Sequence, residues 1–391
     1  MRQWLMIWVT GIGLFLSIPQ DLLALEGEAL PSEGEAERAT SNISFHGYGE
    51  LHFNRPSVAG TGLPTGGQDP TFDFHRLVFG WSWQYNDQIS LHTEIDFEHA
   101  AQEIELEFAY IDYQWIDAVN LRVGSILVPV GYLNEYHEPP NFFSVERPYV
   151  QKFIIPTTWG AGGIGLFGQL FPGVIYRIYF VEGLDANEFS ENGIKDGRQV
   201  LFEDSNKAKN FGGVGRVEYT GLPGLAVGAS FYSAGAAQGD PTIGHSQVTL
   251  WELDLRYRLK GFDLTGLYAM TRITGADRIS AQLLLPDGSP RGTVGSEQFG
   301  WYLEGAYHLG RLIAPMSGWD LVPFVRWEEF DTQSKVPAGF PRNPAMDRRA
   351  LVTGLAYYPV RDIAFKADVE DWKDGTGDKG TRFNLGVAYQ F

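Results

Sequence analysis

The sequence predicts an all-β fold, a transmembrane antiparallel β-barrel of about 16 strands, and three observations lead to this fold class. Most segments after residue 42 alternate apolar and polar residues, which is typical of strands whose two faces meet different surroundings. The connections between these segments are alternately short and long, as in barrels with short periplasmic turns and long external loops. The last stretch, Thr381 to Phe391, is long enough to cross a bilayer as a tilted strand, and its edge can lie in hydrocarbon only if the ring closes.

The composition agrees with a membrane barrel. The chain of 391 residues is 14% aromatic, contains 47 glycines and has no cysteine. After the N-terminus it has no apolar run of about twenty residues that could form a spanning helix, but barrel strands escape that test because their apolar residues alternate with polar ones. The formal charge of -18 argues against nucleic acid as a partner.

The N-terminus predicts an exported protein. Residues 1–24 are expected to form a signal peptide, because Met1-Arg2 is followed by a short apolar run from Trp4 to Ile18. Cleavage is expected near Ala24, with Ala29 as the alternative, and a retained membrane anchor is the competing interpretation. Residues 25–42 are acidic and poor in apolar residues, so we expect a flexible segment there. Residues 43–391 are expected to form the barrel.

From residue 43 onward, sixteen segments have the pattern of strands. The clearest, Ile89–Glu98, places isoleucine, leucine, threonine and phenylalanine on one face and serine, histidine and acidic residues on the other. An even number of strands is what a single-chain bacterial barrel requires. In chain order the predicted strands are Ile43–Asn54, Thr71–Tyr85, Ile89–Glu98, Gln102–Trp115, Asn120–Val128, Gly160–Phe171, Val174–Gly183, Asn210–Thr220, Leu225–Ser233, Gln247–Leu259, Gly261–Thr274, Glu297–Leu309, Asp320–Phe330, Arg348–Tyr358, Ile363–Asp371 and Thr381–Phe391.

The strand count and the inward residues together predict a water-filled lumen. A ring of about sixteen strands leaves an aqueous channel, whereas about eight strands are filled by their own side chains. In the strand Gln247–Leu259, the inward positions include Glu252, Asp254, Arg256 and Arg258. Charges at every second position suit a wet lumen and would be very costly in a dry core.

Four stretches resemble the phosphate-selective porin O and P family. They are Gly47-Tyr48-Gly49-Glu50, the run from Leu121 to Gly131, the run from Val145 to Val150, and the run from Ile154 to Leu166. The resemblance covers about Ser44 to Phe391. It implies a sixteen-stranded barrel that forms homotrimers, with the third outer loop, Pro129–Trp159, folded into the lumen as a constriction. The alternating C-terminal strand that ends on Phe391 also resembles the signal read by the bacterial barrel assembly machinery.

The residues of Pro129–Trp159 support an inserted loop. Four further prolines stiffen the segment, and Phe142, Phe143, Tyr149 and Phe153 are too apolar for a loop in solvent, so we expect them to pack on the barrel wall. The alternative is an external loop that lies in a trimer contact or over the mouth of the barrel.

The charges depart from the phosphate-binding members of the family. Those members are associated with inward arginines and clustered lysines at the constriction, whereas this segment has only Arg147 and Lys152, against Glu135, Glu138 and Glu146. We therefore expect a weakly cation-preferring or unselective pore, with a phosphate- or anion-selective porin as the alternative. An acidic wall formed by the third and fourth strands is expected to oppose basic residues on other walls, although the separation is incomplete because Arg256 shares a strand with Asp254 and Lys366 with Asp368. The acidic wall comprises Glu94, Asp96, Glu98, Glu103, Glu105 and Glu107, and the basic residues are Arg122, Arg177, Arg216, Arg256, Arg258, Lys366 and Arg382. The competing expectation is that the glutamates pair with neighbouring cations.

The sequence offers no catalytic motif, and we expect no enzyme activity, no cofactor and no metal. It has no G-x-S-x-G elbow and no H-E-x-x-H motif, and His46, Glu50 and His52 could at best line one wall of the pore. The candidate pore-lining and constriction residues are Glu94, Asp96, Glu98, Glu105, Glu107, Arg122, Glu135, Glu138, Glu146, Arg147, Lys152, Arg256 and Arg258, and the candidate assembly signal is Phe391.

The predicted function is passive diffusion of small hydrophilic solutes or ions across the bacterial outer membrane. The expected partners are outer-membrane lipid, the barrel assembly machinery and two further copies of the chain in a homotrimer. The alternative class is a structural or adhesin-type barrel that acts through its outer loops. The glycine-rich stretch Ala161–Gly168 is expected to face a close neighbour, either the inserted loop or a trimer partner.

Overall fold

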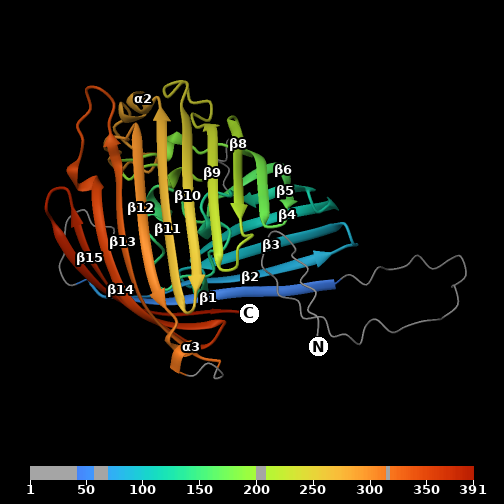
Figure 1. The fold of residues 1–391 in the computed structure, drawn as a ribbon. Helices are drawn as coiled ribbons and strands as arrows, with labels where there is room; N and C mark the ends of the chain where they lie inside the picture. The colour runs from blue at the N-terminus through green and yellow to red at the C-terminus, as the bar shows by residue number, and fades with distance from the viewer. Residues whose placement is uncertain (1–41, 57–68, 200–207, 314–317) are drawn as a thin grey trace, which may run out of the picture.

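The computed structural model describes residues 42–56, 69–199, 208–313 and 318–391. The predicted signal peptide and nearly all of the predicted acidic segment lie outside these residues. The described chain forms one closed antiparallel barrel of sixteen strands, in which each strand pairs with its neighbours in sequence and β1 pairs with β16 to close the ring. The C-terminus therefore lies beside β1, as Figure 1 shows.

The strands agree closely with the predicted ones. Ile89–Glu98, Gly160–Phe171 and Gln247–Leu259 begin and end as expected, and the largest difference is β13, which continues to Lys335 because its last residues pair again with Glu297. The strands are β1 Asn42–Pro56, β2 Thr71–Gln84, β3 Ile89–Glu98, β4 Glu103–Ile116, β5 Val119–Leu127, β6 Gly160–Phe171, β7 Val174–Glu182, β8 Phe211–Tyr219, β9 Leu225–Gly235, β10 Gln247–Leu259, β11 Phe262–Thr274, β12 Glu297–Tyr307, β13 Asp320–Lys335, β14 Asp347–Val360, β15 Ile363–Asp374 and β16 Lys379–Gln390.

The helices in the described residues are short and lie in the connections. Within those residues, no helix has both the length and the apolar character needed to span a membrane. Three of the helices belong to the connection between β5 and β6. In chain order the helices are η2 Tyr132–Asn134, η3 Pro139–Asn141, α1 Val150–Phe153, η4 Ala186–Glu188, η5 Lys195–Gly197, α2 Ala276–Ser280, α3 Leu309–Ile313 and η6 Pro344–Met346.

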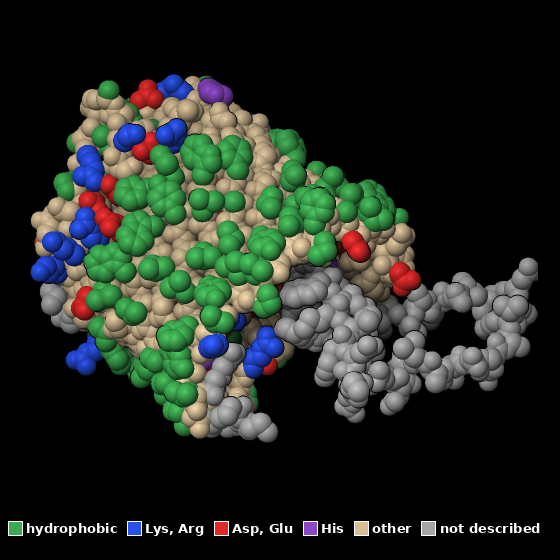
Figure 2. Space-filling view, in the orientation of Figure 1, with side chains coloured by type: hydrophobic (Ala, Val, Ile, Leu, Met, Phe, Trp, Pro, Cys, Tyr) green, Lys and Arg blue, Asp and Glu red, His purple; other side chains and the backbone are tan. Residues whose placement is uncertain are grey.

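The two faces of the barrel differ in polarity. In β10, Leu253 is 60% exposed on the outside, whereas its neighbours Glu252 and Asp254 are 1% and 3% exposed. Figure 2 shows hydrophobic side chains spread over the outer surface of the strands from β8 to β13. An apolar outside with buried charges inside is the reverse of a soluble protein, and it fits a bilayer around the ring.

Two β-bulges change which residues face inward. Between β1 and β2, Glu50 pairs with Arg76 but Leu51 pairs with Phe74, so that His75 is an extra residue. Between β3 and β4, Glu107 is the extra residue in the same way. A bulge re-aims side chains, and these two add ionisable groups to one wall.

Candidate functional site

The segment between β5 and β6, residues 128–159, contacts the inner face of distant strands. The backbone N–H of Val145 donates to Asp368 of β15 at 2.6 Å, and that of Tyr149 donates to Glu328 of β13 at 2.6 Å. These carboxylates lie at inward positions of the wall, where they are 2% and 0% exposed. A segment with only three short helices leaves most backbone groups without a partner in regular secondary structure, and here the barrel wall supplies partners.

Lys366 of β15 is a second anchor for this segment. Its Nζ atom donates to the backbone carbonyls of Pro139 at 2.7 Å and Ser144 at 2.9 Å, and it lies 3.9 Å from the centre of the Phe142 ring. The lysine and all three of its contacts are mostly or completely buried. Sequence analysis counted Lys366 among the basic wall residues but gave it no role in holding the segment.

Aromatic packing reinforces these hydrogen bonds. Tyr149 lies 4.2 Å from Trp372, and Phe153 stacks on Phe330 at 5.3 Å between ring centres. All four rings are at most 3% exposed. Aromatic pairs of this kind add about 0.5–1.5 kcal/mol beyond the burial of their surface, so the segment has a defined packing against β13 and β15.

Arg76 of β2 is the centre of a buried ion-pair network that sequence analysis missed. Its guanidinium lies 2.9 Å from Glu98, 3.3 Å from Glu50, 3.6 Å from Asp96 and 3.9 Å from Glu107. Arg76 has the same inward parity as the acidic residues, which is the signal that could have identified it. Three of the candidate acidic residues therefore share one cation.

Glu107 also connects the wall to the segment. His137 of the segment lies with Nε2 2.7 Å from Glu107 and 2.9 Å from the Tyr48 hydroxyl, and Tyr48 donates to Glu107 at 3.0 Å. Glu94 lies beside this group and bonds to His46 at 2.8 Å. The predicted residues Glu94 and Glu107 thus lie together, joined to the segment by a histidine.

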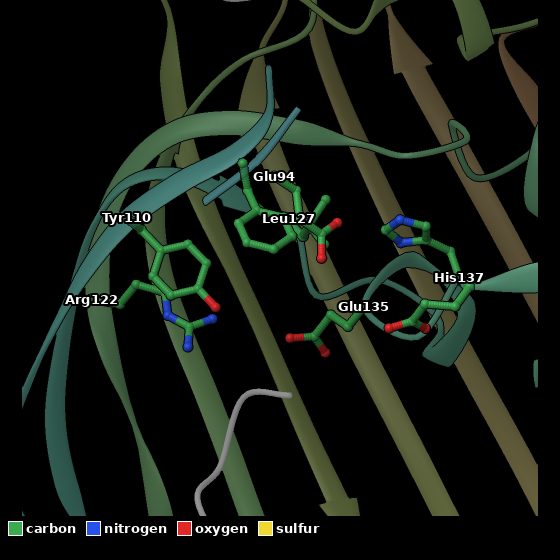
Figure 3. A pocket seen from close by; sticks show the side chains of 8 residues that line it. Glu94, Tyr110, Arg122, Leu127, Glu135 and His137 are labelled. Atoms are coloured by element: carbon green, nitrogen blue, oxygen red, sulfur yellow. The ribbon is translucent and has the colours of Figure 1, made fainter. Parts of the chain in front are cut away.

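A small pocket with a volume of about 20 Å³ adjoins this group. It has room for about one water molecule, so it is no passage for solutes. Figure 3 shows Tyr110 and Arg122 on one side of the pocket, Glu135 and His137 on the other, and Glu94 beside them. The lining residues are Glu94, Phe108, Tyr110, Arg122, Leu127, Glu135, His137 and Glu138.

Glu105 and Arg122 are paired as well. Glu105 lies 3.2 Å from Arg198 of the connection between β7 and β8. Arg122 bonds to Asp112 through two hydrogen bonds of 2.8 Å and lies 3.8 Å above the Tyr110 ring. Arg122 is therefore held flat against the wall.

The first two acidic residues of the segment have separate partners. Glu135 lies 2.9 Å from Arg177 of β7, and Glu138 accepts a hydrogen bond of 2.7 Å from Asn141. The Glu135 side chain is 4% exposed, so its charge is compensated by the arginine rather than by water.

Glu146 lies on the opposite side of the segment, near β1 and β16. It accepts a hydrogen bond of 2.8 Å from Asn54 and lies 3.7 Å from Arg382. Burial alone would raise the pKa of the Glu146 carboxyl, but Arg382, Lys152 and His52 together hold that pKa well below its ordinary value. Glu146 is therefore an ionised carboxylate that ties the segment to the wall.

Arg147 and Lys152 differ from the other candidate cations. Arg147 donates to the Thr158 hydroxyl at 3.0 Å and to the backbone carbonyl of His137 at 3.3 Å. Among the residues that the structure describes, neither Arg147 nor Lys152 has a carboxylate within 4.0 Å. Among the described residues, Arg348 of β14 and Lys366 of β15 also have no carboxylate within that distance, so Arg147 and Lys152 are two of several cations that an anion in the lumen could meet.

Arg256 and Arg258 occupy the short-turn end of β10. Arg256 lies 3.0 Å from Glu218 and 4.7 Å from the centre of the Tyr132 ring, so it reaches the segment. Arg258 pairs with Asp263, and its side chain is 65% exposed. Arg258 is a rim residue, which distinguishes it from the other candidates.

The separation of acidic and basic walls is incomplete, as expected, and Arg76 of β2 adds a cation among the acids of β1, β3 and β4. The remaining walls mix both signs in the same way, because long inward side chains on adjacent strands reach one another across the ladder. The competing expectation, in which the glutamates pair with neighbouring cations, agrees better with the residues that the structure describes in the lumen. Further mixed groups are Arg216 with Glu218, Glu252 and Asp254, Arg326 with Glu304 and Glu328, and Arg382 with Glu370.

Comparison with known proteins identifies relatives by sequence and by fold. The chain is 31% identical over 362 residues to an uncharacterized protein of Aquifex aeolicus, covering 88% of this chain and 79% of that protein. No protein-family model matches the chain, so the resemblance to the phosphate-selective O and P family stays a prediction.

The solved structures with this fold are outer-membrane porins and channels. They include the Salmonella typhi OmpF complex with daunomycin, with a TM-score of 0.59, 12% identity, and coverage of 90% of this chain and 98% of that one. The outer-membrane channel DcaP of Acinetobacter baumannii has a TM-score of 0.57 at 12% identity, with coverage of 92% and 99%. The anion-selective porin from Comamonas acidovorans has a TM-score of 0.54 at 13% identity, with coverage of 90% and 100%. Identities this low show the shared porin fold and no more.

Proposed function

The chain belongs to the same family as an uncharacterized protein of Aquifex aeolicus and has the porin fold, and from this premise we propose that it is a porin of the bacterial outer membrane. It lets small hydrophilic solutes or ions diffuse passively through a water-containing lumen. The observation that carries this proposal is the closed ring of sixteen strands with charged residues inside and apolar residues outside. Charges that line an apolar cylinder have a use only where water or ions pass.

In this proposal the segment 128–159 is the constriction. Its anchors come from several strands around the ring, namely Asp368 and Lys366 of β15, Glu328 of β13 and Glu252 of β10. A segment held from both sides of a barrel must cross its interior, which narrows the passage. This geometry supports the inserted loop over an external one.

The pairing of charges supports a weakly selective pore. An ion that passes Arg76 or Arg216 meets charges of both signs, but carboxylates outnumber the cation in each group, so the arginines reduce the negative field without cancelling it and a weak preference for cations remains. Rings of one sign, which give strong selectivity, do not form among the described residues.

An anion-selective porin is the second candidate, and one observation favours it. Arg147 and Lys152 of the constriction have no described carboxylate partner within 4.0 Å, and unpaired cations attract anions. Phosphate binding at these two residues would restore the function that the family resemblance implies.

Swelling of liposomes that contain the purified protein tests the proposed function. The isotonic solutes are sugars of increasing size. If the protein is a porin, the rate of swelling is expected to fall as the sugar becomes larger. Replacing the anchor Asp368 with Asn is expected to admit larger sugars, because the constriction is held less tightly. Swelling equal to that of protein-free liposomes at every size would refute passive diffusion.

The remaining predictions concern export and assembly. Residues 1–24 are proposed to be removed as a signal peptide, and the barrel assembly machinery is proposed to insert the mature chain by recognising the end at Phe391. A homotrimer is proposed from the family resemblance. Mass spectrometry of the mature N-terminus and the native mass in detergent test the first and last of these proposals.

A further inference from the structure

Two histidines and an aspartate meet at the end of the barrel where the long connections lie. Asp73 and His75 belong to β2, and His99 belongs to the turn between β3 and β4. The Nδ1 atoms of His75 and His99 both lie 3.0 Å from the same oxygen, Oδ2 of Asp73. The three ligand atoms all lie within 4.8 Å of one another.

Local backbone structure brings these three side chains together. The bulge at His75 places this residue on the inner side of β2 together with Asp73, which pairs with His52. The turn after β3 has three successive non-glycine residues with positive φ, at His99, Ala100 and Ala101, a rare backbone arrangement. Its backbone is fixed to β2, because the N–H of His99 donates to the carbonyl of His75 at 3.0 Å.

A third histidine supports the group without serving as a ligand. The His52 ring stacks on the His75 ring at 4.8 Å, with an angle of 16° between the planes, and its Nε2 atom is engaged by Glu50 at 3.0 Å. This stacking fixes the orientation of the His75 ring. Outer contacts that orient a ligand are typical of metal sites.

From this geometry we propose that Asp73, His75 and His99 form a binding site for a divalent transition-metal ion such as Zn²⁺. The two aspartate–histidine separations of 3.0 Å are close to the value of about 3.3 Å that bonds of about 2.05 Å produce between ligand atoms in a tetrahedral site, and the two histidine nitrogens lie within 4.8 Å of each other. Two imidazoles and one carboxylate suit zinc, cobalt, nickel or copper, whereas calcium and magnesium prefer oxygen ligands. All three side chains are 29–42% exposed, so an ion and one or two waters can reach them.

The proposed metal site can be tested separately from solute passage. It lies beside Glu98 and Arg76, at the end of the charged wall, so a bound ion adds two positive charges next to the acidic network. Zinc binding is measured on the intact protein in detergent without any flux. If zinc does not bind, the porin proposal still stands. If the porin proposal is refuted, the zinc site still stands.

Zinc binding to the purified full chain in detergent tests the inference. Calorimetric titration with zinc chloride, and metal analysis after desalting, are expected to give one equivalent per chain. His99→Ala and Asp73→Asn are each expected to weaken binding at least tenfold. The matched control is His245→Ala, which removes an exposed histidine of the connection between β9 and β10 and is expected to leave the affinity within twofold.

Cobalt provides a second measurement that does not depend on the variants. Titration of the wild-type chain with Co²⁺ is expected to produce the visible absorption of a four- or five-coordinate ion, and excess zinc is expected to abolish it. The inference is overturned if the wild-type chain retains no stoichiometric zinc and shows no such absorption. It is also overturned if His99→Ala and Asp73→Asn, with unchanged circular dichroism, bind zinc as tightly as the wild type.

Discussion

The carboxylate of Asp368 accepts a hydrogen bond of 2.6 Å from the backbone N–H of Val145, 223 residues earlier in the chain. Two residues before Asp368, on the same face of β15, Lys366 donates to the carbonyls of Pro139 and Ser144. One strand therefore presents an acceptor and a donor to the two kinds of backbone group that the segment leaves unpaired. This arrangement makes β15 the main anchor of the proposed constriction.

Replacing Lys366 with Met is expected to loosen the segment. The change keeps much of the side-chain volume but leaves two buried carbonyls without a donor, at a cost of about 1–3 kcal/mol each. We expect a lower midpoint of unfolding in guanidinium and a larger single-channel conductance with more noise. Unchanged conductance and noise in the variant would show that Lys366 does not hold a constriction.

The control for this change is Lys335→Met. Lys335 forms an exposed pair with Glu297 at 3.0 Å, with its side chain 66% exposed, so its loss is expected to cost less than about 1 kcal/mol. It lies at the end of β13 and makes no described contact with the segment.

Replacing Arg76 with Gln is expected to destabilise the barrel and increase its preference for cations. The change leaves buried carboxylates without their shared cation, and breaking such a network typically costs about 3–5 kcal/mol. Denaturant unfolding measures the first effect, and the reversal potential in a salt gradient measures the second. Arg349→Gln is the control, because it breaks a half-exposed pair with Glu329 at 3.3 Å; equal losses in the two variants would contradict the network.

The contribution of Glu146 is expected to depend on pH. The pKa of its carboxyl is lowered in the folded protein from an ordinary value of 4.5, so its stabilisation is complete above about pH 4.5 and is lost as the pH falls toward the lowered folded value. Glu146→Gln should therefore be less stable than the wild type at pH 6. The difference should shrink below about pH 4.5, and a gap that stays constant down to pH 3 would contradict the ion pairs proposed for Glu146.

Deleting Phe391 is expected to slow assembly. Its backbone exchanges two hydrogen bonds with Gly47, at 2.9 and 3.1 Å, across the seam that closes the ring, and its ring contacts Phe79. Insertion into liposomes in the presence of the assembly machinery measures the rate, and Phe391→Tyr is expected to insert normally. Normal insertion of the truncated chain would show that the terminal residue is not the signal.

The fold could be predicted from the sequence because each strand carries its own evidence. The alternation in Ile89–Glu98 or Gln247–Leu259 is local, and the turns between strands have short, recognisable sequences. The bulges could not be predicted, because the choice of His75 or Glu107 as the extra residue depends on the register with the neighbouring strand.

The site was predicted only in part for the same reason. Inward parity identified Glu94 and Glu107, but which cation each one meets depends on the register and on the conformation of the segment between β5 and β6. His137 could not be assigned to Glu107 from a separation in sequence. The glycines of Ala161–Gly168 were expected to face the inserted loop or a trimer partner, and this stays a prediction. The adjacent strand β7 is also close, because a Cβ atom at Gly163 would lie 2.8 Å from the carbonyl of Phe180.

Single-channel recording of the purified protein in a planar bilayer tests the central claim most directly. If the protein is a porin, we expect stepwise increases in current and a conductance that rises with salt concentration. We also expect a small reversal potential that decreases as the screening length falls to about 3 Å at 1 M salt. Strong anion selectivity with block by low phosphate would contradict the weakly selective pore and favour the phosphate-selective alternative. Correctly folded protein that inserts without any current steps would contradict the porin account and favour a barrel that acts through its outer loops.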